Sequence, residues 1–519
     1  MKEEGEKEEK EEEVKAKEKR EKEEEVCDAS SDGGGDAKSE ARKAAGCSGL
    51  GIDLIKALGE KGIEMMHSVM SKVWEEGKMP RDWKESEVIP IYKRKGDPLD
   101  CGNYRGIKML EHGMKVMEKI LEQRLRKIVA INEMQFGFIP GRSTTNAIFM
   151  IQQLQEKYTE KNKNLYMAFV DLEKAYDRVP RDLVYWCLRK RMVPERLVKL
   201  VMATYQESTT KVRTVHGRTE SFQIEVGLHQ GSGLSPFLFA IVLDTISAEM
   251  REGLPKELLF ADDLAVIAET EQDLQRRWII WQKTMEAKGL KVNTGKTEVM
   301  VSGKGDERIV IRDKEGETLN QVQKFKYLGL MLGEKGGSML AVRARVKAAW
   351  EKWREIGPVI GDKKIPRKLK TKLYTTMVRP VILYGAECWV VGQKEEQLLE
   401  TTEMRMLRRI RGVTLEDKMR SEDIRKELGV CPIGEKARES RLRWFGHVMR
   451  REPENHLKQM LNLEVPGRRP RGRPKGRWRD GITRDMKQLH IEAEDAEDRS
   501  FWRKRTQAAD LNLGTGASR

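Results

Sequence analysis

Apolar and polar residues follow two different periodicities in the first third of the chain. Apolar residues recur at helical spacing between Ile63 and Val73, and residues 114–131 are amphipathic with the same spacing, so we expect a helix in each place. Residues 87–92 (EVIPIY) are typical of a β-strand that leads into a basic loop at 93–98. The pattern therefore predicts a mixed helix and strand region.

Between residues 165 and 301, short apolar strands alternate with helices. Residues 166–170 (YMAFV) predict a strand that ends at Asp171, and apolar runs on both sides of Asp262 and Asp263 predict a β-hairpin with these two acids in its turn. This alternation marks the segment as the predicted catalytic core.

Helical spacing is found in two further stretches of the chain. A helix is expected over 236–250, and residues 338–412 are expected to be mostly helical, with Trp353 and Tyr374 among the packing residues. From residue 413 the chain becomes strongly basic.

The overall charge points to a polyanionic partner. The chain has 519 residues, which is enough for several domains, and a net charge of +15, so nucleic acid is the first candidate. Residues 1–48 are of low complexity, first rich in Glu and Lys and then in Gly and Ser, and are expected to be disordered, with a charged single helix as the alternative.

Cysteine usage and hydropathy indicate the compartment. The six cysteines are scattered without metal-binding spacing, which predicts reduced thiols in an intracellular protein, nuclear or cytoplasmic. No apolar window is long enough for a membrane span, and the charged N-terminus is not a signal peptide, so no membrane partner is expected.

Asp171, Asp262 and Asp263 form the candidate chemical centre. Adjacent carboxylates repel each other, and a hard cation such as Mg²⁺, with Mn²⁺ as an alternative, relieves that repulsion. If the two strands are neighbours, the three acids would hold two ions roughly 3.5–4 Å apart. The alternative is an ordinary hairpin turn, in which Asp is a favoured residue.

Seven motifs surround these acids. They are residues 103–107 (NYRGI), 135–144 (QFGFIPGRST), 169–177 (FVDLEKAYD), 227–236 (GLHQGSGLSP), 260–263 (FADD), 289–297 (GLKVNTGKT) and 325–329 (FKYLG). In this order they resemble the motifs of reverse transcriptases, more specifically those of non-LTR (LINE-type) retrotransposons.

The resemblance implies a right-hand polymerase fold of the α+β class. Fingers would span 49–164, a palm with an antiparallel sheet 165–335, a helical thumb 336–412, and a basic nucleic-acid-binding region 413–519. The implied activity is that of an RNA-directed DNA polymerase, a nucleotidyltransferase that uses an RNA template, a DNA primer or target, and deoxynucleoside triphosphates. The alternatives are an RNA-dependent RNA polymerase and a decayed, non-catalytic nucleic-acid-binding protein.

The resemblance also assigns roles to single residues. The three acids would bind the metal ions, Lys296 would protonate the leaving pyrophosphate, and Tyr176 would exclude a 2′-hydroxyl. The implied nucleotide- and template-binding residues are Arg105, Lys93, Lys95, Gln230 and Gly231, and the implied primer grip consists of Phe325, Tyr327, Leu328 and Gly329. The alternatives are a solvated surface lysine for Lys296, a core aromatic for Tyr176, and a plain apolar turn for 325–329.

Two features concern the ends of the chain. The basic run contains Arg471, Gly472, Arg473 and Pro474, which resemble the core of an AT-hook, while a nuclear-import signal and a non-specific phosphate contact are the alternatives. The segment before the fingers is too short for an endonuclease domain, and the C-terminal region lacks the spacing of a Cys/His knuckle, so we expect a truncated retrotransposon product.

Overall fold

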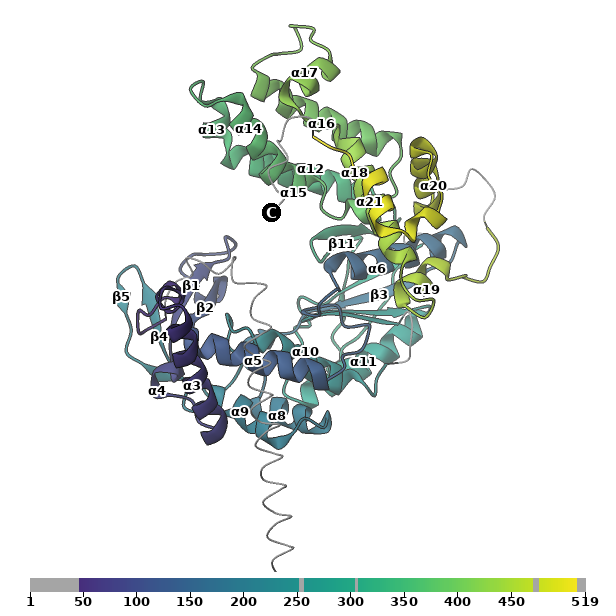
Figure 1. The fold of residues 1–519 in the computed structure, drawn as a ribbon. Coiled ribbons are helices and arrows are strands. Elements are labelled where there is room, and N and C mark those ends of the chain that lie inside the picture. The colour runs from purple at the N-terminus through teal and green to yellow at the C-terminus, as the bar shows by residue number, and fades with distance from the viewer. Residues whose placement is uncertain (1–45, 252–255, 304–306, 470–475, 511–519) are drawn as a thin grey trace, which may run out of the picture. The chain divides into compact units, whose positions relative to one another are not determined.

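The computed structural model describes residues 46–251, 256–303, 307–469 and 476–510 (Figure 1). Most of the segment predicted to be disordered, and the AT-hook-like residues Arg471, Gly472, Arg473 and Pro474, lie outside the described residues. Ser48, by contrast, already belongs to the ordered structure, because its backbone N–H and its hydroxyl both donate to the Glu111 carboxylate at 2.7 Å.

The described residues divide into two compact units. Unit 1 draws on the ranges 1–132, 173–249 and 285–291, and unit 2 on 133–172, 250–284 and 292–519. Helices and mixed sheets occur together, which confirms the predicted α+β class.

Unit 1 combines a small sheet with helices. Its strands run in the order β2-β1-β4-β5, with β6 also paired to β4, and β1 and β4 are parallel. The elements are α2 (Ile52–Ala57), α3 (Glu60–Glu76), α4 (Arg81–Lys84), β1 (Glu85–Tyr92), η2 (Cys101–Asn103), β2 (Tyr104–Met109), α5 (His112–Ile128), α7 (Ala175–Arg178), α8 (Arg181–Lys190), α9 (Glu195–Tyr205), β4 (Thr209–Thr214), β5 (Gly217–Arg218), β6 (Phe222–Gln223) and α10 (Ser235–Ser247).

The helix predicted around Ile63 is α3, but its packing differs from the expectation. Met70, Val73 and Trp74 are buried, whereas the Ile63 side chain is 62% exposed. The indole of Trp74 is contacted by guanidinium groups of the neighbouring helices, with Arg124 of α5 at 3.9 Å from the ring centroid. The C-terminal half of α3 therefore carries the packing face.

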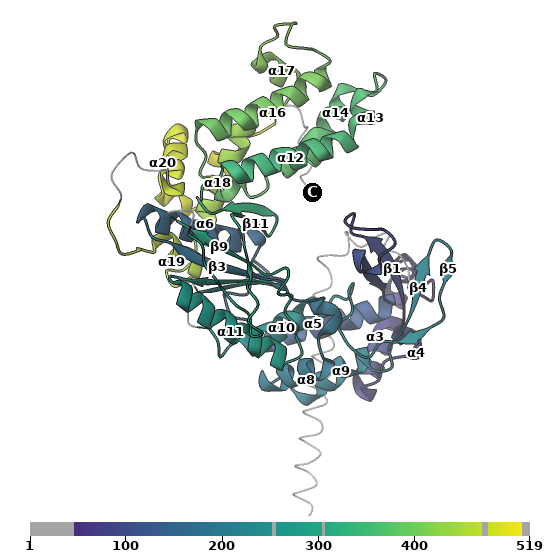
Figure 2. The same ribbon diagram turned by 180° about the vertical axis from the view of Figure 1, so that it is seen from behind.

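Unit 2 begins with the sheet that carries the candidate acids. Its strand order is β10-β9-β3-β8-β7, and every residue of the central strand β3 is buried. Figures 1 and 2 show α6 and α11 on opposite faces of this sheet, which explains why β3 is a continuous apolar run. The predicted antiparallel pairing holds for four strands, and the two-residue strand β10 adds a parallel pair.

The remaining elements of unit 2 are mostly helical, as predicted for 338–412, and they continue beyond that range. The elements of the unit are α6 (Thr144–Glu160), β3 (Leu165–Val170), β7 (Glu257–Phe260), β8 (Asp263–Ala268), α11 (Glu271–Ala287, its last three residues counted with unit 1), β9 (Glu298–Ser302), β10 (Asn320–Gln321), β11 (Lys324–Tyr327), β12 (Leu330–Gly333), α12 (Met339–Glu355), α13 (Gly357–Gly361), α14 (Arg367–Leu373), η3 (Tyr374–Val378), α15 (Arg379–Ile382), η4 (Ala386–Cys388), α16 (Gln393–Arg411), α17 (Ser421–Leu428), α18 (Ile433–Met449), α19 (His456–Asn462), α20 (Trp478–Leu489), η5 (Glu494–Ala496) and α21 (Arg499–Thr506).

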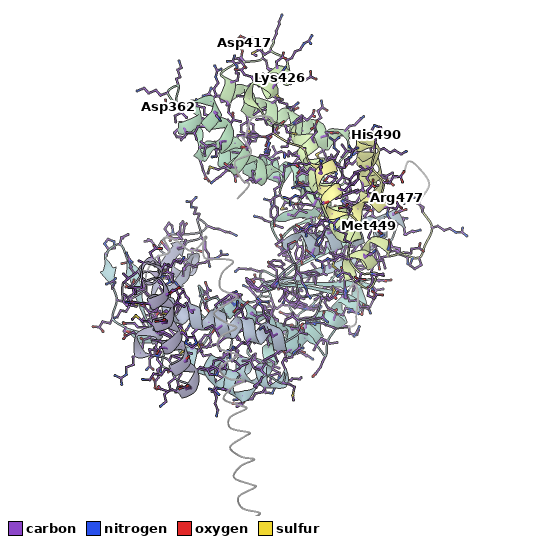
Figure 3. All side chains as sticks on the ribbon, viewed as in Figure 1. Asp362, Asp417, Lys426, Met449, Arg477 and His490 are labelled. Carbon is purple, nitrogen blue, oxygen red and sulfur yellow. The ribbon has the colours of Figure 1, made fainter. Side chains whose placement is uncertain are left out.

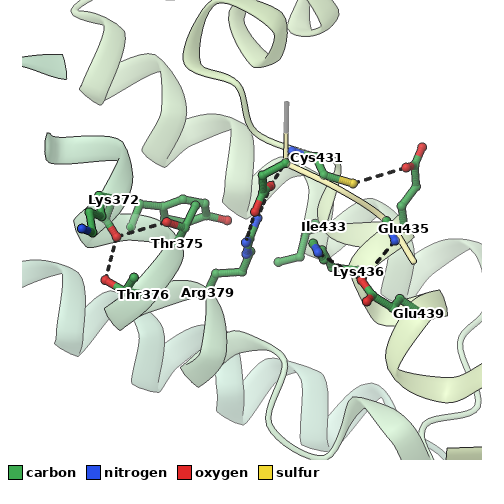
Figure 4. A network of polar contacts seen from close by, with 12 residues as sticks. Lys372, Thr375, Thr376, Arg379, Cys431, Ile433, Glu435, Lys436 and Glu439 are labelled. Carbon is green, nitrogen blue, oxygen red and sulfur yellow. Dashed lines mark hydrogen bonds and ion pairs between the residues drawn. The ribbon is translucent and has the colours of Figure 1, made fainter. Parts of the chain in front are cut away.

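The basic C-terminal region is folded where it is described. Trp478 and Trp502 are each 1% exposed and join the core that also contains the predicted packing residues Trp353 and Tyr374. Figure 4 shows part of the polar network that holds the end of this region, in which Arg379 donates two hydrogen bonds to Asp510, at 2.8 and 2.6 Å. Across the described part of the chain, no helix combines the length and the apolar character that crossing a membrane requires.

Candidate active site

The three predicted acids gather at one end of the unit 2 sheet. In the antiparallel pair β3–β8, Val170 is opposite Leu264, so the next step of the register places Asp171 opposite Asp263. Residues opposite each other in an antiparallel pair have Cα atoms about 4.5–5.5 Å apart and side chains on the same face. Asp262 precedes this pair in the turn of the β7–β8 hairpin.

The acids influence one another electrostatically. Desolvation, together with the negative charges of Asp262 and Asp171, raises the pKa of Asp263 to about 6. The pKa of Asp171 is also raised, first by desolvation and also by Asp262, although Lys296 acts in the opposite direction. The site therefore concentrates negative charge at a cost that a cation would relieve.

Lys296 lies beside Asp171. Its Nζ atom is 3.8 Å from Oδ2 of the carboxylate. The loop that carries it also holds the Asp171 backbone, because the Asn293 N–H donates to the Asp171 carbonyl at 2.8 Å and the Asp171 N–H donates to the Thr297 hydroxyl at 3.4 Å. The motif at 289–297 thus fixes the end of β3, and the sequence had indicated no such role for Thr297.

The Gln135 side chain forms a hydrogen bond to the turn of the β7–β8 hairpin, which carries Asp262. The sequence did not predict this role. The buried side-chain oxygen of Gln135 accepts hydrogen bonds from the N–H groups of Gly137, at 2.9 Å, and Ala261, at 3.1 Å. Ala261 has a φ of 54°, in the left-handed region that costs energy for a residue with a Cβ. A Cβ on Gly137 would lie 2.2 Å from the Ala261 nitrogen, so only glycine fits there.

The donor set of the site suits a divalent cation. Carboxylate oxygens are the hard ligands that Mg²⁺ prefers, and the charges of Asp262 and Asp171 both raise the pKa of Asp263. Within the described ranges, no three Asp, Glu, His or Cys side chains already converge as a metal cage. The Lys296 ammonium lies within 4 Å of one oxygen of the Asp171 carboxylate, at 3.8 Å.

In unit 1, the predicted nucleotide-binding residues Tyr176 and Gln230 belong to adjoining segments. The Leu228 N–H donates to the Tyr176 carbonyl at 2.7 Å, and the Gln230 amide donates to Asp177 at 2.9 Å. The Tyr176 ring stacks on Phe239 of α10 with centroids 4.7 Å apart. Tyr176 is therefore positioned by an aromatic contact within its own unit.

Residue 231 has to be glycine because its backbone lies close to the backbone of Lys108. Its φ is 118°, and a Cβ would lie 2.5 Å from the Lys108 carbonyl of β2. The Lys108 N–H in turn donates to the Gln230 carbonyl at 2.7 Å. The glycine-rich motif is thereby attached to the sheet of unit 1, a packing reason that adds to the predicted contact with substrate.

Arg105, Lys93 and Lys95 lie on or next to the β1–β2 hairpin of unit 1, and all three are exposed. The Lys93 ammonium donates to the Gly102 carbonyl at 2.9 Å, and its charge lowers the pKa of Asp177, which desolvation raises. Lys93 and Gln230 thus both act on Asp177.

A buried acid beneath the glycine-rich motif was not foreseen. Glu118 of α5 is 0% exposed, and its carboxylate accepts a hydrogen bond from the Gly233 N–H at 3.2 Å. Desolvation raises the pKa of Glu118 to about 7 and lowers the pKa of nearby Lys108 to about 8. In sequence, Glu118 is simply one charged residue of an amphipathic helix, so no pattern marks it.

The predicted primer grip is the β11–β12 hairpin of unit 2. Leu328 and Gly329 form its turn with φ values of 45° and 84°, as a two-residue type I′ turn requires. Phe325 stacks on Phe169 of β3 with centroids 3.9 Å apart. Tyr327 is 2% exposed, so its ring is part of the core and supports the hairpin from inside.

The candidate acids and the motifs around them lie in a range that matches the model of a known protein family. Residues 91–332 match the family model described as reverse transcriptase (RNA-dependent DNA polymerase), and this range includes Asp171, Asp262, Asp263 and Lys296. Residues 91–332 are thus similar to the reverse transcriptase family. The relationship to the polymerases of non-LTR retrotransposons, expected from the seven motifs, is confirmed by the curated relatives of the chain.

Two of these relatives define the extent of the match. The RNA-directed DNA polymerase from mobile element jockey of Drosophila melanogaster is 25% identical over 476 residues, which cover 87% of this chain and 51% of that protein. The Pol polyprotein from the type-1 retrotransposable element R2 of Nasonia vitripennis is 25% identical over 328 residues, which cover 59% of this chain and 32% of that protein. The chain thus spans at most about half the length of either relative.

Among solved structures, this chain is similar to telomerase from Candida tropicalis in complex with a fragment of telomeric RNA. The match has a TM-score of 0.37 and 12% identity, and covers 72% of this chain and 66% of that one.

Proposed function

We propose that this chain is an RNA-directed DNA polymerase that adds deoxynucleotides to the 3′-hydroxyl of a primer. The observation that carries the proposal is the register of β3 and β8, which sets Asp171 opposite Asp263 with Asp262 in the adjoining turn, inside a reverse transcriptase domain. In the reaction, the primer 3′-oxygen attacks the α-phosphate of the nucleotide, a new P–O bond forms, and pyrophosphate leaves.

The chemistry would depend on divalent metal ions. Two Mg²⁺ ions, when bound, supply the positive charge that activates the 3′-hydroxyl and stabilises the leaving pyrophosphate. Asp171, Asp262 and Asp263 would hold these ions. Lys296 would release its pairing with Asp171 as the ions bind and would give a proton to the pyrophosphate. The β11–β12 hairpin would hold the primer end.

The choice of sugar would depend on unit 1. Tyr176 would lie beneath the incoming sugar and leave no room for a 2′-hydroxyl, and its contact with Phe239 restricts the movement of its ring. Arg105, Lys93 and Lys95 would bind the triphosphate, since exposed basic side chains match phosphate oxygens. The proposed position of Tyr176 favours DNA synthesis over RNA synthesis.

The experiment is primer extension with the purified chain. A DNA primer on an RNA template is incubated with deoxynucleotides and Mg²⁺, in parallel with ribonucleotides and with EDTA. We expect extension that requires Mg²⁺ and favours deoxynucleotides. Efficient use of ribonucleotides would indicate an RNA polymerase. Template binding without any extension would indicate a decayed, non-catalytic nucleic-acid-binding protein.

A further inference from the structure

A strongly basic pocket lies in the C-terminal helical part of unit 2, inside the range 413–519 that the resemblance predicts to bind nucleic acid and outside the residues 91–332 that match the reverse transcriptase model. It has a volume of about 540 Å³. It is lined by Arg443, His447, Arg450, Arg451, Arg499, Trp502 and Arg503. These residues come from α18, from the segment that follows it and from α21, which pack against each other. Figure 3 labels Met449, the last residue of α18, directly before Arg450.

The arginines of this pocket are mostly not neutralised, unlike other arginines of the same region. Arg441, also on α18, is buried and donates twice to Asp485, at 2.9 and 2.7 Å. In the pocket, Arg443 pairs with Glu439. Arg499 and Arg503 are exposed and form no ion pair with any described residue. The lining itself contains no carboxylate.

The pocket is preorganised by contacts that leave its charge in place. Arg450 donates to the Ala496 carbonyl, and Arg451 lies 3.3 Å from the His447 ring nitrogen. The Trp502 indole donates to the Leu442 carbonyl at 2.8 Å and forms a buried wall.

His447 reports the electrostatic character of this space. Desolvation lowers the pKa of its imidazole, and the charges of Arg451, Arg450 and Arg499 lower it further. All three arginines act in one direction, and no acid offsets them. The pocket thus holds positive charge that an anion would stabilise.

We propose that this pocket binds phosphate groups of a nucleic-acid strand held by the polymerase. Guanidinium groups form paired hydrogen bonds with phosphate oxygens, and several of them around one cavity suit consecutive phosphates of a backbone. The choice of nucleic acid rests on the proposed function, whereas the anion site rests on the pocket itself. A free phosphate has the same chemistry, so the experiment has to separate the two sources.

The test is equilibrium binding of a fluorescent single-stranded RNA oligonucleotide to the full chain over a salt series, without nucleotides. The variant Arg499→Gln/Arg503→Gln removes two pocket charges from exposed positions. The control Lys504→Gln/Arg505→Gln removes two charges from the same helix outside the pocket. Arg505 donates to the Leu489 carbonyl at 2.9 Å, so the control also includes the loss of a contact within the fold.

We expect the pocket variant to bind about tenfold or more weakly, with a salt slope reduced by about 1.4 for two lost contacts on a single strand. The control should stay within about threefold of the unmodified chain. Equal weakening in both variants would overturn the proposal in favour of diffuse charge. Protection of the pocket arginines from phenylglyoxal by inorganic phosphate but not by the oligonucleotide would overturn it in favour of a small-anion site. Because binding is measured without synthesis, an inactive polymerase would leave the result unaffected.

Discussion

The Nζ atom of Lys296 lies 3.8 Å from Oδ2 of Asp171, so the proposed proton donor also neutralises a proposed metal ligand. Replacing Lys296 with Gln removes the proton donor and the charge that competes with a cation. We expect kcat for primer extension to fall by about 10²- to 10⁴-fold. The Mg²⁺ concentration at half-maximal rate should fall as well, as measured by titrating Mg²⁺ in the extension assay.

Lys291→Gln is the matched control, because Lys291 belongs to the same motif and lies 3.6 Å from Glu173 instead. It should leave the Mg²⁺ dependence unchanged. An unaltered Mg²⁺ midpoint in Lys296→Gln would show that the lysine does not compete for this site.

Gly137 allows the acidic hairpin to approach the segment that carries Gln135. Gly137→Ala places a Cβ 2.2 Å from the Ala261 nitrogen, which has to shift the turn that carries Asp262. We expect a loss of about 1–3 kcal/mol in the free energy of unfolding and a marked loss of extension. Gly481→Ala on α20, where a Cβ meets nothing within 4 Å, is the control and should not destabilise the chain. Denaturant unfolding of both variants measures the difference, and equal stability would contradict the tight contact.

The sequence was sufficient to predict the strands that carry the acids, because their signals are local. The apolar run at β3 and the Asp262–Asp263 turn predicted a strand and a hairpin, and the order of the motifs predicted the family. The register that sets Asp171 opposite Asp263 depends on pairing between strands distant in sequence, which no local pattern specifies.

The residues that position the site motifs through hydrogen bonds could not be predicted from the sequence for the same reason. Gln135 acts through a hydrogen bond to the Ala261 backbone, 126 positions away, and Glu118 through one to the Gly233 backbone, 115 positions away. The exposure of Ile63 was also not predictable, because helical spacing shows which residues share a face but not whether another element covers it. The folding of the basic C-terminal region depends on pairs such as Arg441 with Asp485, which composition does not reveal.

Asp263 should make stability depend on pH. Its folded-state pKa of about 6 lies above the ordinary value of 3.8, so its protonated form favours folding. This contribution is full below about pH 4 and is lost as the pH rises through about 6. In EDTA, the Tm of the unmodified chain should fall by about 1–3 °C relative to that of Asp263→Asn as the pH rises from 4 to 7.

Mg²⁺ should offset this loss at pH 7 in the unmodified chain and have a smaller effect in Asp263→Asn. Thermal unfolding in EDTA and in Mg²⁺ tests both statements. If the Tm of the unmodified chain and that of Asp263→Asn changed in parallel with pH, the raised pKa of Asp263 would be refuted.

Tyr176→Ala should increase ribonucleotide incorporation relative to deoxynucleotide incorporation, because it opens space beneath the sugar. The change also removes the ring contact with Phe239, so some stability is lost. Tyr176→Phe keeps the ring and should keep the discrimination, which separates the sugar effect from packing. Single-nucleotide incorporation measures both, and equal discrimination by the unmodified chain and Tyr176→Ala would exclude Tyr176 as the selective residue.

The most direct test of the central claim is single-turnover extension of a DNA primer on an RNA template by Asp171→Asn in Mg²⁺. We predict a rate reduced by about 10³-fold or more, with template binding unchanged, because a metal ligand loses its charge. Asp182→Asn, at an exposed position in the first turn of α8, is the control and should extend at the unmodified rate. Extension by Asp171→Asn at the rate of the unmodified chain would contradict the assignment of the active site.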